Sequence, residues 1–254
     1  MKIRLVRHAT TIVIAGGSKI LVDPMLSPAG AMAPVENSAN RLRNPLVDLP
    51  ASAGDLIDVD AVLLTHTHRD HFDSEAASLL PRYLPLLCQP EDQEKLLGMG
   101  FGKVIPVNTS FCWNGITFTR TGGRHGTGEI GKMMGPVSGF VLEAENEPRL
   151  YIAGDTVWCP EVESALGSFQ PEITVVYSGA ARFNTGDPIT MTADDIIRVC
   201  LKNEGTRILA VHMEAFNHCA LTREELGRRL EKEGLSGRVI IPADGEWVDF
   251  SGSL

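Results

Sequence analysis

The sequence predicts an α/β fold in a single domain of 254 residues. Short runs rich in valine, isoleucine and leucine alternate with helix-type segments, which is typical of sheets that carry helices on their faces. Hydrophobic residues make up 43% of the chain and charged residues 22%, an ordinary globular composition that supplies a large core. One domain over residues 1–254 is the expected organisation.

The amino-terminal strands and their turns come first. Strand-type runs cover residues 3–6, 11–14 and 19–23. Ala15-Gly16-Gly17-Ser18 has the composition of a hairpin turn between the last two runs. His8 lies at the first hairpin, where we expect it to pack or to form hydrogen bonds. Asp23 ends the third run at a strand tip, where a carboxylate can orient a metal-bound histidine, although Asp-Pro is also an ordinary turn sequence.

A long loop is expected over residues 24–50, which are rich in proline, alanine, asparagine and serine and have no sustained periodicity. Long ordered loops in compact domains usually cover a site or contact a partner. This loop is therefore expected to set substrate specificity or to contribute to a homo-oligomer. Arg41 and Arg43 could meet an anionic group of a substrate, and a solvated pair of arginines is the equal alternative.

The densest pattern of the chain is residues 65–73, THTHRDHFD, directly after an apolar run. If this segment is extended, His66 and His68 point in the same direction and form a pair of imidazole ligands. Asp70 and His71 fall in the turn before a helix-type segment, where they could reach a second ion. Imidazole suits zinc, and a carboxylate also admits manganese or iron, so the pattern predicts a metal site without naming the metal. A solvated histidine-rich turn is the alternative.

Strand and helix signals continue to alternate after this pattern. Expected strands cover residues 84–88, 103–107, 115–121, 138–143, 149–153, 172–177, 206–212, 238–242 and 246–250. Expected helices cover residues 74–80, 91–97, 161–166 and 222–233, and a further helix begins after Thr192. Thr192 and Asp195 have the spacing of an acidic capping box.

Three further residues stand where polar side chains can project from sheet ends. His125 lies in a glycine-rich loop, which indicates a ligand-bearing segment. Asp155 directly follows an apolar strand and a glycine, and His212 ends another strand. A helix cap is the alternative for Asp155, and a core histidine is the alternative for His212. Because the central pattern is present upstream, we expect all three to be metal ligands.

Charge and cysteine content narrow the class of protein and its compartment. The formal net charge is −9, so no basic field exists to hold a nucleic-acid backbone, and no nucleic-acid partner is expected. Five scattered cysteines contain no Cys-x-x-Cys pair, which argues against a disulfide framework and fits a reducing cytoplasm. No stretch approaches the roughly 20 apolar residues of a membrane span, so a soluble, unprocessed cytoplasmic protein is expected.

In chain order, these patterns resemble the five successive motifs of the metallo-β-lactamase superfamily. The matching positions are Asp23, His66-x-His68-x-Asp70-His71, His125, Asp155 and His212. The resemblance implies a four-layer αββα sandwich with two metal ions at one edge of the sheets. It also implies that the first ion is held by His66, His68 and His125, and the second by Asp70, His71 and His212. Asp155 would bridge the two ions.

Within the superfamily, the chain looks most like the ascorbate-6-phosphate lactonase-like branch of metal-dependent hydrolases. The residues that carry this closer resemblance are Arg7-His8-Ala9-Thr10, Asp23-Pro24 and Phe72-Asp73. It implies a hydrolase in which a hydroxide bound by two divalent ions is the nucleophile. The ions would be zinc or manganese, with iron as a further option. The substrate would be a lactone or related cyclic ester of a sugar-like acid, with or without a phosphate. Two such ions with two aspartates and a hydroxide leave one positive charge, which suits an anionic small-molecule substrate.

Catalytic roles and rival functions follow from the same resemblance. Asp70 would steer the nucleophile and accept its proton, and His218 or Tyr177 would assist the leaving group. A structural role at a helix entrance is the alternative for His218. The rival functions are a phosphodiesterase and a catalytically silent metal-dependent binding module. Oxidoreduction is disfavoured because flavodiiron members of this fold carry an acid where this chain has His68, and no flavin domain is visible in the sequence.

Overall fold

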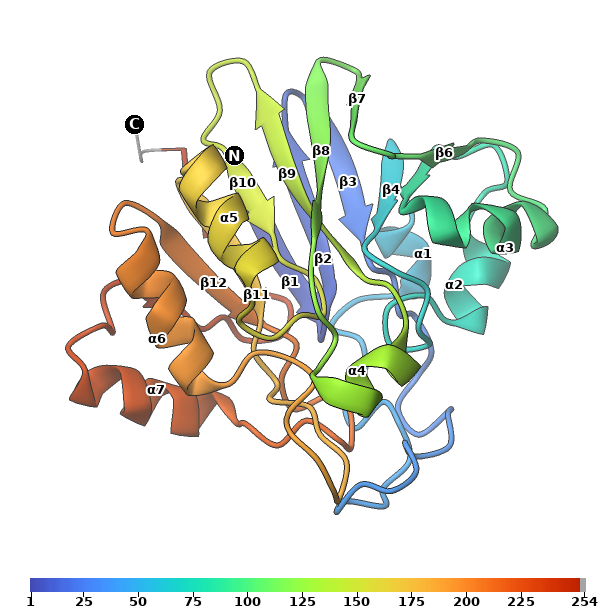
Figure 1. Ribbon diagram of the computed structural model, residues 1–254. Coiled ribbons are helices and arrows are strands. Elements are labelled where there is room, and N and C mark those ends of the chain that lie inside the picture. Colours follow the sequence, from blue (N-terminus) through green and yellow to red (C-terminus); the bar gives the residue numbers. More distant parts are fainter. Residues whose placement is uncertain (252–254) are drawn as a thin grey trace.

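Two seven-stranded β-sheets face each other in the computed structural model, which describes residues 1–251 (Figure 1). The first sheet has the order β14-β1-β2-β3-β4-β5-β6. Its strands are β1 (Lys2–Arg7), β2 (Thr10–Ala15), β3 (Ser18–Val22), β4 (Ala61–Leu64), β5 (Leu86–Cys88), β6 (Val104–Pro106) and β14 (Trp247–Asp249). The second has the order β13-β12-β11-β10-β9-β8-β7. Its strands are β7 (Ser110–Trp113), β8 (Ile116–Gly122), β9 (Ser138–Ala144), β10 (Leu150–Ile152), β11 (Ile173–Tyr177), β12 (Arg207–Val211) and β13 (Val239–Ile240).

Helices cover the outer face of each sheet. The first sheet packs against α1 (Ala53–Leu56), α2 (Ser74–Leu79) and α3 (Gln93–Gly98), which follows the 3-10 turn η1 (Pro90–Asp92). The second packs against α5 (Pro160–Phe169), α6 (Ala193–Lys202) and α7 (Arg223–Lys232). The predicted four-layer αββα sandwich is therefore confirmed. Among the described residues, no helix has the length and apolar character that crossing a bilayer requires.

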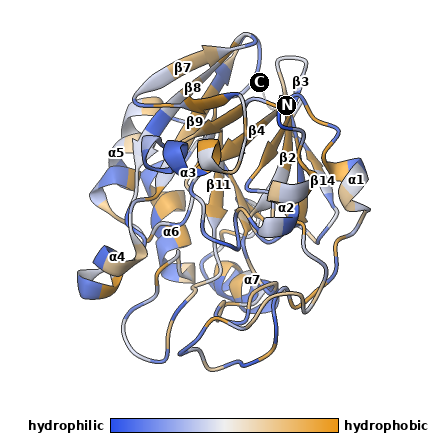
Figure 2. Ribbon diagram, turned by 90° about the vertical axis from the view of Figure 1, so that its right-hand side faces the viewer, coloured by the Kyte–Doolittle hydropathy of each residue, from blue (hydrophilic) through white to orange (hydrophobic). Residues whose placement is uncertain are grey.

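Alternation along the strands explains how the layers share their hydrophobic residues. In β4, Ala61 and Leu63 belong to the core between the sheets, whereas Val62 and Leu64 pack under the helices of the first sheet. Successive side chains of a strand point to opposite faces, so a strand buried on both faces reads as a continuous apolar run. Figure 2 shows the same division: the strands are mostly hydrophobic in colour, and the helices carry both colours.

The carboxyl ends of the central strands meet at one edge of the sandwich. Strands β3, β4, β5 and β6 are parallel, as are β10, β11, β12 and β13. Strand β8 runs in the same direction as β10, because each pairs antiparallel with β9 between them. In Figure 1 this edge faces down, and α4 (Gly128–Met134) lies below it. The residues that follow these strands are consequently brought together.

Most sequence-predicted elements are found within a few residues of the expected bounds. The capping box of Thr192 and Asp195 is present in both directions. Three short elements were not expected: α1, β7 and α4. The four residues of α1 and the largely exposed strand β7 lack a clear hydrophobic period, and α4 lies in a glycine-rich stretch interpreted as loop. The predicted long loop over residues 24–50 is present, with α1 following it.

Candidate metal centre

Each predicted metal ligand lies just after a strand at the shared edge. His66 and His68 follow β4 in an irregular segment, and their ring centroids are 4.4 Å apart. Asp70 and His71 occupy the turn before α2. The helix begins after Asp73, whose side chain caps it by accepting a hydrogen bond from the backbone N–H of Ala76 at 2.8 Å. The remaining ligands, His125, Asp155 and His212, follow β8, β10 and β12.

The side chains form two groups in which potential ligand atoms lie within 4.8 Å of one another. The first group contains His66, His68 and His125. The second contains Asp70, His71, Asp155 and His212. The structure thus brings together all seven residues proposed as ligands, and Asp155, which the sequence resemblance placed between the two ions, falls in the second group by this distance.

Asp155 lies between the two groups. Its Oδ2 atom is 3.2 Å from Nε2 of His125, in the first group, and 3.2 Å from Nε2 of His71, in the second. Its Oδ1 atom is 3.2 Å from Nε2 of His212. A carboxylate with one oxygen near histidines of both groups can coordinate two cations at once.

The donor atoms fit divalent cations. Nδ1 of His71 is 2.9 Å from Oδ2 of Asp23, and Nδ1 of His125 is 2.8 Å from the carbonyl oxygen of Ile189, so each ring turns its Nε2 atom toward Asp155. Nε2 of His66 is buried and has no hydrogen-bond partner among residues 1–251. A buried polar atom without a partner is costly, and a cation would satisfy it. Imidazole nitrogens with carboxylate oxygens suit zinc, manganese and iron.

Without a cation, the cluster holds opposite charges at close range. Burial lowers the pKa of His66 well below 6.5, so this ring is neutral at pH 7. Burial alone would also lower the pKa of His71 and His212, but Asp155 and Asp70 outweigh it. They raise the pKa of His71 well above 6.5 and that of His212 to about 10. The surrounding histidines in turn hold the pKa of Asp155 well below its usual value despite its burial.

Asp23 connects the centre to the sheets. Its Oδ1 accepts from the backbone N–H of Thr65 at 2.8 Å, and its Oδ2 accepts from the Thr65 hydroxyl at 2.7 Å. The hydroxyl of Tyr177 donates to the same Oδ2 at 2.8 Å. Tyr177 is fully buried and is not among the described residues that line the cavity described next.

A cavity of about 430 Å³ opens onto the centre. It is lined by Ala33, Pro34, Val35, Glu36, His68, Arg69, Asp70, His125, Met134, Phe183 and His218. The predicted loop therefore supplies one wall through residues 33–36. Neither arginine of that loop lines this cavity among the described residues: Arg41 is exposed, and Arg43 donates to the carbonyl oxygens of Gly30 and Ala31 at 2.6 and 2.9 Å.

His218 lines this cavity and is 8% exposed. Burial lowers its pKa to about 4, so the imidazole is neutral at pH 7. Its Nδ1 atom has no hydrogen-bond partner within residues 1–251. The position suits a neutral ring that contacts a substrate.

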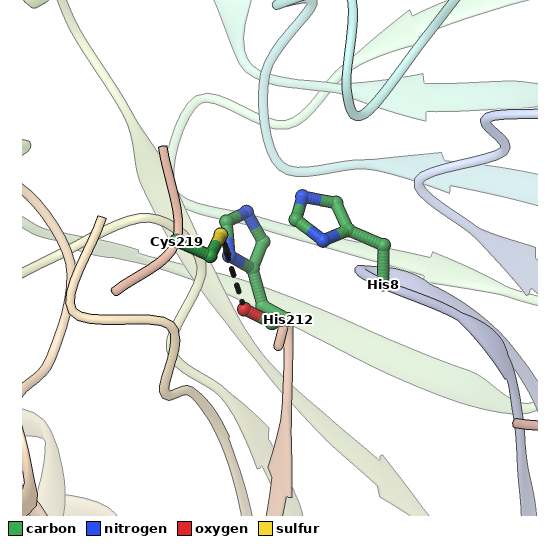
Figure 3. A group of neighbouring side chains, drawn as sticks. All are labelled: His8, His212 and Cys219. Atoms are coloured by element: carbon green, nitrogen blue, oxygen red, sulfur yellow. Dashed lines mark hydrogen bonds between the residues drawn. The ribbon is translucent and has the colours of Figure 1, made fainter. Parts of the chain in front are cut away.

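Two residues contact the His212 ring: His8, which the sequence predicted to pack, and Cys219, which the sequence did not single out. Figure 3 shows Cys219 and His8 on opposite sides of the His212 ring. The Sγ atom of Cys219 is 3.8 Å from Nδ1 of His212, and the rings of His8 and His212 are 3.6 Å apart between centroids. His8 also lies 3.4 Å from Oδ2 of Asp70 through Nε2, so it packs and contacts a polar group as expected. A lone cysteine in a sequence gives no signal of such a contact, so Cys219 was missed.

Asn217 is a second residue that the sequence did not single out. Its side-chain oxygen accepts from the backbone N–H of Val35 at 2.8 Å, and its amide group donates to the carbonyl oxygen of Val35 at 3.1 Å. The same amide donates to Ser38 Oγ at 2.6 Å and to the carbonyl oxygen of Asn40. Asn217 therefore fixes the loop segment that forms the cavity wall.

Known proteins resemble the chain over nearly its whole length. The Beta-lactamase superfamily domain model matches residues 18–213. The UPF0173 protein YddR of Bacillus subtilis is 39% identical over 98% of this chain and 100% of its own length. An isothiocyanate hydrolase from Delia radicum gut bacteria has a TM-score of 0.94 with 37% identity over 98% of this chain and 99% of its own.

Two further relatives carry hydrolase names. A possible metal-dependent hydrolase from Veillonella parvula has a TM-score of 0.95, with 35% identity over 98% of both chains. A UPF0173 metal-dependent hydrolase of Methylacidiphilum infernorum is 24% identical over 94% of this chain and 96% of its own length. The family model covers more than half of the chain and every proposed ligand. The chain therefore belongs to the beta-lactamase superfamily and is a metal-dependent hydrolase.

Proposed function

We propose that the seven ligand residues bind two divalent cations, zinc or manganese, and that the chain hydrolyses a small substrate at an electrophilic carbon. The position of Asp155 carries this proposal, because its two oxygens lie 3.2 Å from histidines of both ligand groups. The cations would supply a hydroxide nucleophile at neutral pH and polarise the bond under attack. The cavity beside them has room for a small organic substrate.

The chain's own residues take the remaining roles. Asp70 lines the cavity, and the histidines around it keep its carboxylate ionised despite its burial, so it can orient the nucleophile by accepting a hydrogen bond from it. The neutral His218 ring can exchange a hydrogen bond with the substrate. Tyr177, the other residue predicted to aid the leaving group, donates its hydroxyl to Asp23.

An isothiocyanate is the substrate class that we favour. The relative named isothiocyanate hydrolase is 37% identical across nearly the full length of both chains. The central carbon of R–N=C=S is electrophilic and the group is uncharged, which suits a cavity wall where Arg69 and Glu36 bring opposite charges. Adding one water molecule across the C=N bond gives a thiocarbamic acid, which separates into an amine and carbonyl sulfide.

A lactone or related cyclic ester is the second candidate. Its carbonyl carbon is attacked in the same way, and the neutral His218 ring in the cavity is available to the departing alcohol. A phosphorylated or otherwise anionic substrate, and the lactonase-like branch itself, remain predictions of the sequence. A phosphodiester draws less support, because Arg69 is the one lysine or arginine among the cavity-lining residues that the structure describes.

The test combines metal content with a substrate panel. Protein purified without chelator is analysed for metal per chain, then assayed on an isothiocyanate, a lactone and a phosphodiester. The Asp155→Asn variant is compared with Asp58→Asn, which changes an exposed aspartate. We expect two ions per chain and isothiocyanate turnover that chelation abolishes, with both lost in Asp155→Asn and retained in Asp58→Asn. Turnover that survives complete metal removal would refute the proposal.

A further inference from the structure

Phe183 stands at the junction of three cavities. It lines the catalytic cavity, a neighbouring cavity of about 410 Å³ and a third of about 360 Å³. The side chain is half-buried, in the loop after β11. Since one ring forms a wall of all three spaces, a substrate larger than the catalytic cavity can extend past it into one of the other two.

The two side cavities differ in character. The 410 Å³ cavity is lined largely by polar residues, including Asn40, Arg182 and Asn217. Asn217 already bonds to the loop, so several polar groups of that cavity are satisfied within the protein. The 360 Å³ cavity is a groove lined by Asn37, Ile130, Met133, Met134, Phe183, Asn184 and Thr185. We call it the apolar groove.

Helix α4 gives the apolar groove unusually exposed hydrophobic side chains. Every residue of this helix is at least partly exposed, and Met133 is 82% exposed. Ile130 and Met134 stand beside it in the groove. Adjacent exposed apolar side chains commonly mark a binding site, and methionine adapts to ligands of different shape.

The walls of the groove are fixed to one another. A Cβ atom added at Gly186 would collide with Cδ1 of Ile130, so the loop after β11 touches α4 directly. The hydroxyl of Thr127 donates to Asp187 at 3.1 Å. On the opposite side, the backbone N–H of Asn184 donates to the carbonyl oxygen of Asn37 at 2.6 Å. The groove is thus formed by three segments that contact each other.

We propose that the apolar groove binds the apolar alkyl or aryl substituent of the substrate while its reactive group occupies the catalytic cavity. This inference rests on the proposed function. Continuity carries it, since Met134 and Phe183 line both spaces. Each additional methylene that enters the groove is expected to raise kcat/KM about fourfold, the factor that corresponds to burial of one such group.

The first test observes binding without turnover. The protein is labelled with ¹³C at its methionine methyl groups and titrated with 2-phenylethanol, an uncharged and unreactive probe. We expect the methyl resonances of Met133 and Met134 to shift, and that of Met99, at the end of α3, to remain in place. Unchanged Met133 and Met134 resonances would overturn the inference. Shifts that grow with protein concentration before any probe is added would also overturn it, in favour of a second copy in the groove.

The second test uses a substrate series with methyl, butyl and 2-phenylethyl isothiocyanates. Met133→Glu places a charge in the groove at an exposed position, and Met99→Glu is the matched control at a site 38% exposed. We expect the preference for larger substituents to fall at least tenfold in Met133→Glu and to persist in Met99→Glu. An unchanged preference in Met133→Glu would refute the inference. If no isothiocyanate is hydrolysed but the methyl resonances shift, the groove stands and the proposed function fails.

Discussion

The carboxylate of Asp23 lies 2.9 Å from Nδ1 of His71, and Nε2 of the same ring lies 3.2 Å from Asp155. One hydrogen bond therefore sets which nitrogen of His71 faces the proposed cations. Asp23 is fully buried at the end of β3, and it also accepts from Thr65 and Tyr177. The orientation of the centre consequently depends on a residue that does not itself lie in either ligand group.

Replacing Asp23 with alanine tests this dependence. The change leaves His71, Thr65 and Tyr177 without their acceptor, and loss of such a partner typically lowers metal affinity 10- to 100-fold. Unpaired buried donors should also lower the free energy of unfolding by about 1–3 kcal/mol each. Competition with a chromophoric chelator measures the affinity, and chemical denaturation measures the stability. Asp58→Ala serves as the exposed control, and equal metal affinity in the two variants would contradict the role of Asp23.

Metal binding should release protons. In the metal-free protein the neighbouring carboxylates raise the pKa of His71 and His212, and the Nε2 atoms of the two rings lie 3.3 Å apart, so the pair holds at least one extra proton at pH 7. A cation needs the free lone pair of each ring, so we expect at least one proton to leave as the site fills, and affinity to rise with pH. Calorimetry in two buffers with different ionisation enthalpies gives the number. Binding without proton release would mean that these rings are already neutral.

Much of the fold and site is visible in the sequence because strands and ligands leave local signals. The strands are short apolar runs, and Asp155 and His212 each follow one directly. The supporting contacts leave no such signal. Arg7 lies within a strand, yet it is fully buried and donates to the carbonyl oxygens of Met25, Ser27 and Val47. Such contacts join residues distant in the chain, so they depend on tertiary packing that local patterns do not encode.

Helix α4 illustrates the same limit at the apolar groove. Glycines at positions 126, 128, 131 and 135 indicate a loop by local propensity. Gly131 nevertheless lies within α4. A Cβ atom at this position would lie 2.6 Å from the carbonyl oxygen of Gly126, so the close approach of the two backbone segments requires glycine here. Helix propensity alone would count the same glycine as a helix breaker.

Metal removal should destabilise the whole fold. The two ligand groups join segments after β4, β8, β10 and β12, so the cations would cross-link both sheets. A ligand at 1,000 times its dissociation constant stabilises the native state by about 4 kcal/mol per site. We expect chelation to lower the Tm of the protein by about 15 °C or more if both sites are that fully saturated. In Asp155→Asn, most of this difference in Tm between the metal-loaded and the chelated protein should disappear. Equal Tm values with and without chelator would indicate that the cations do not support the fold.

Asn217 offers a change that affects the cavity without touching the proposed ligands. Its side chain bonds to Val35, Ser38 and Asn40, and Val35 lines the catalytic cavity. In Asn217→Ala the loop loses these bonds, so its wall should become mobile and substrate should bind more weakly.

For Asn217→Ala we expect KM to increase about tenfold and kcat to change much less. The tenfold factor corresponds to the loss of roughly one hydrogen bond of binding free energy. Metal content should stay at the wild-type value, because no bond of Asn217 reaches a ligand residue in the part of the chain that the structure describes. Asn203→Ala is the matched control, since this buried asparagine bonds to Pro171 and Gly205 at the far end of α6. A fall in metal content or in kcat alone would show that Asn217 acts on the centre itself and not through the loop.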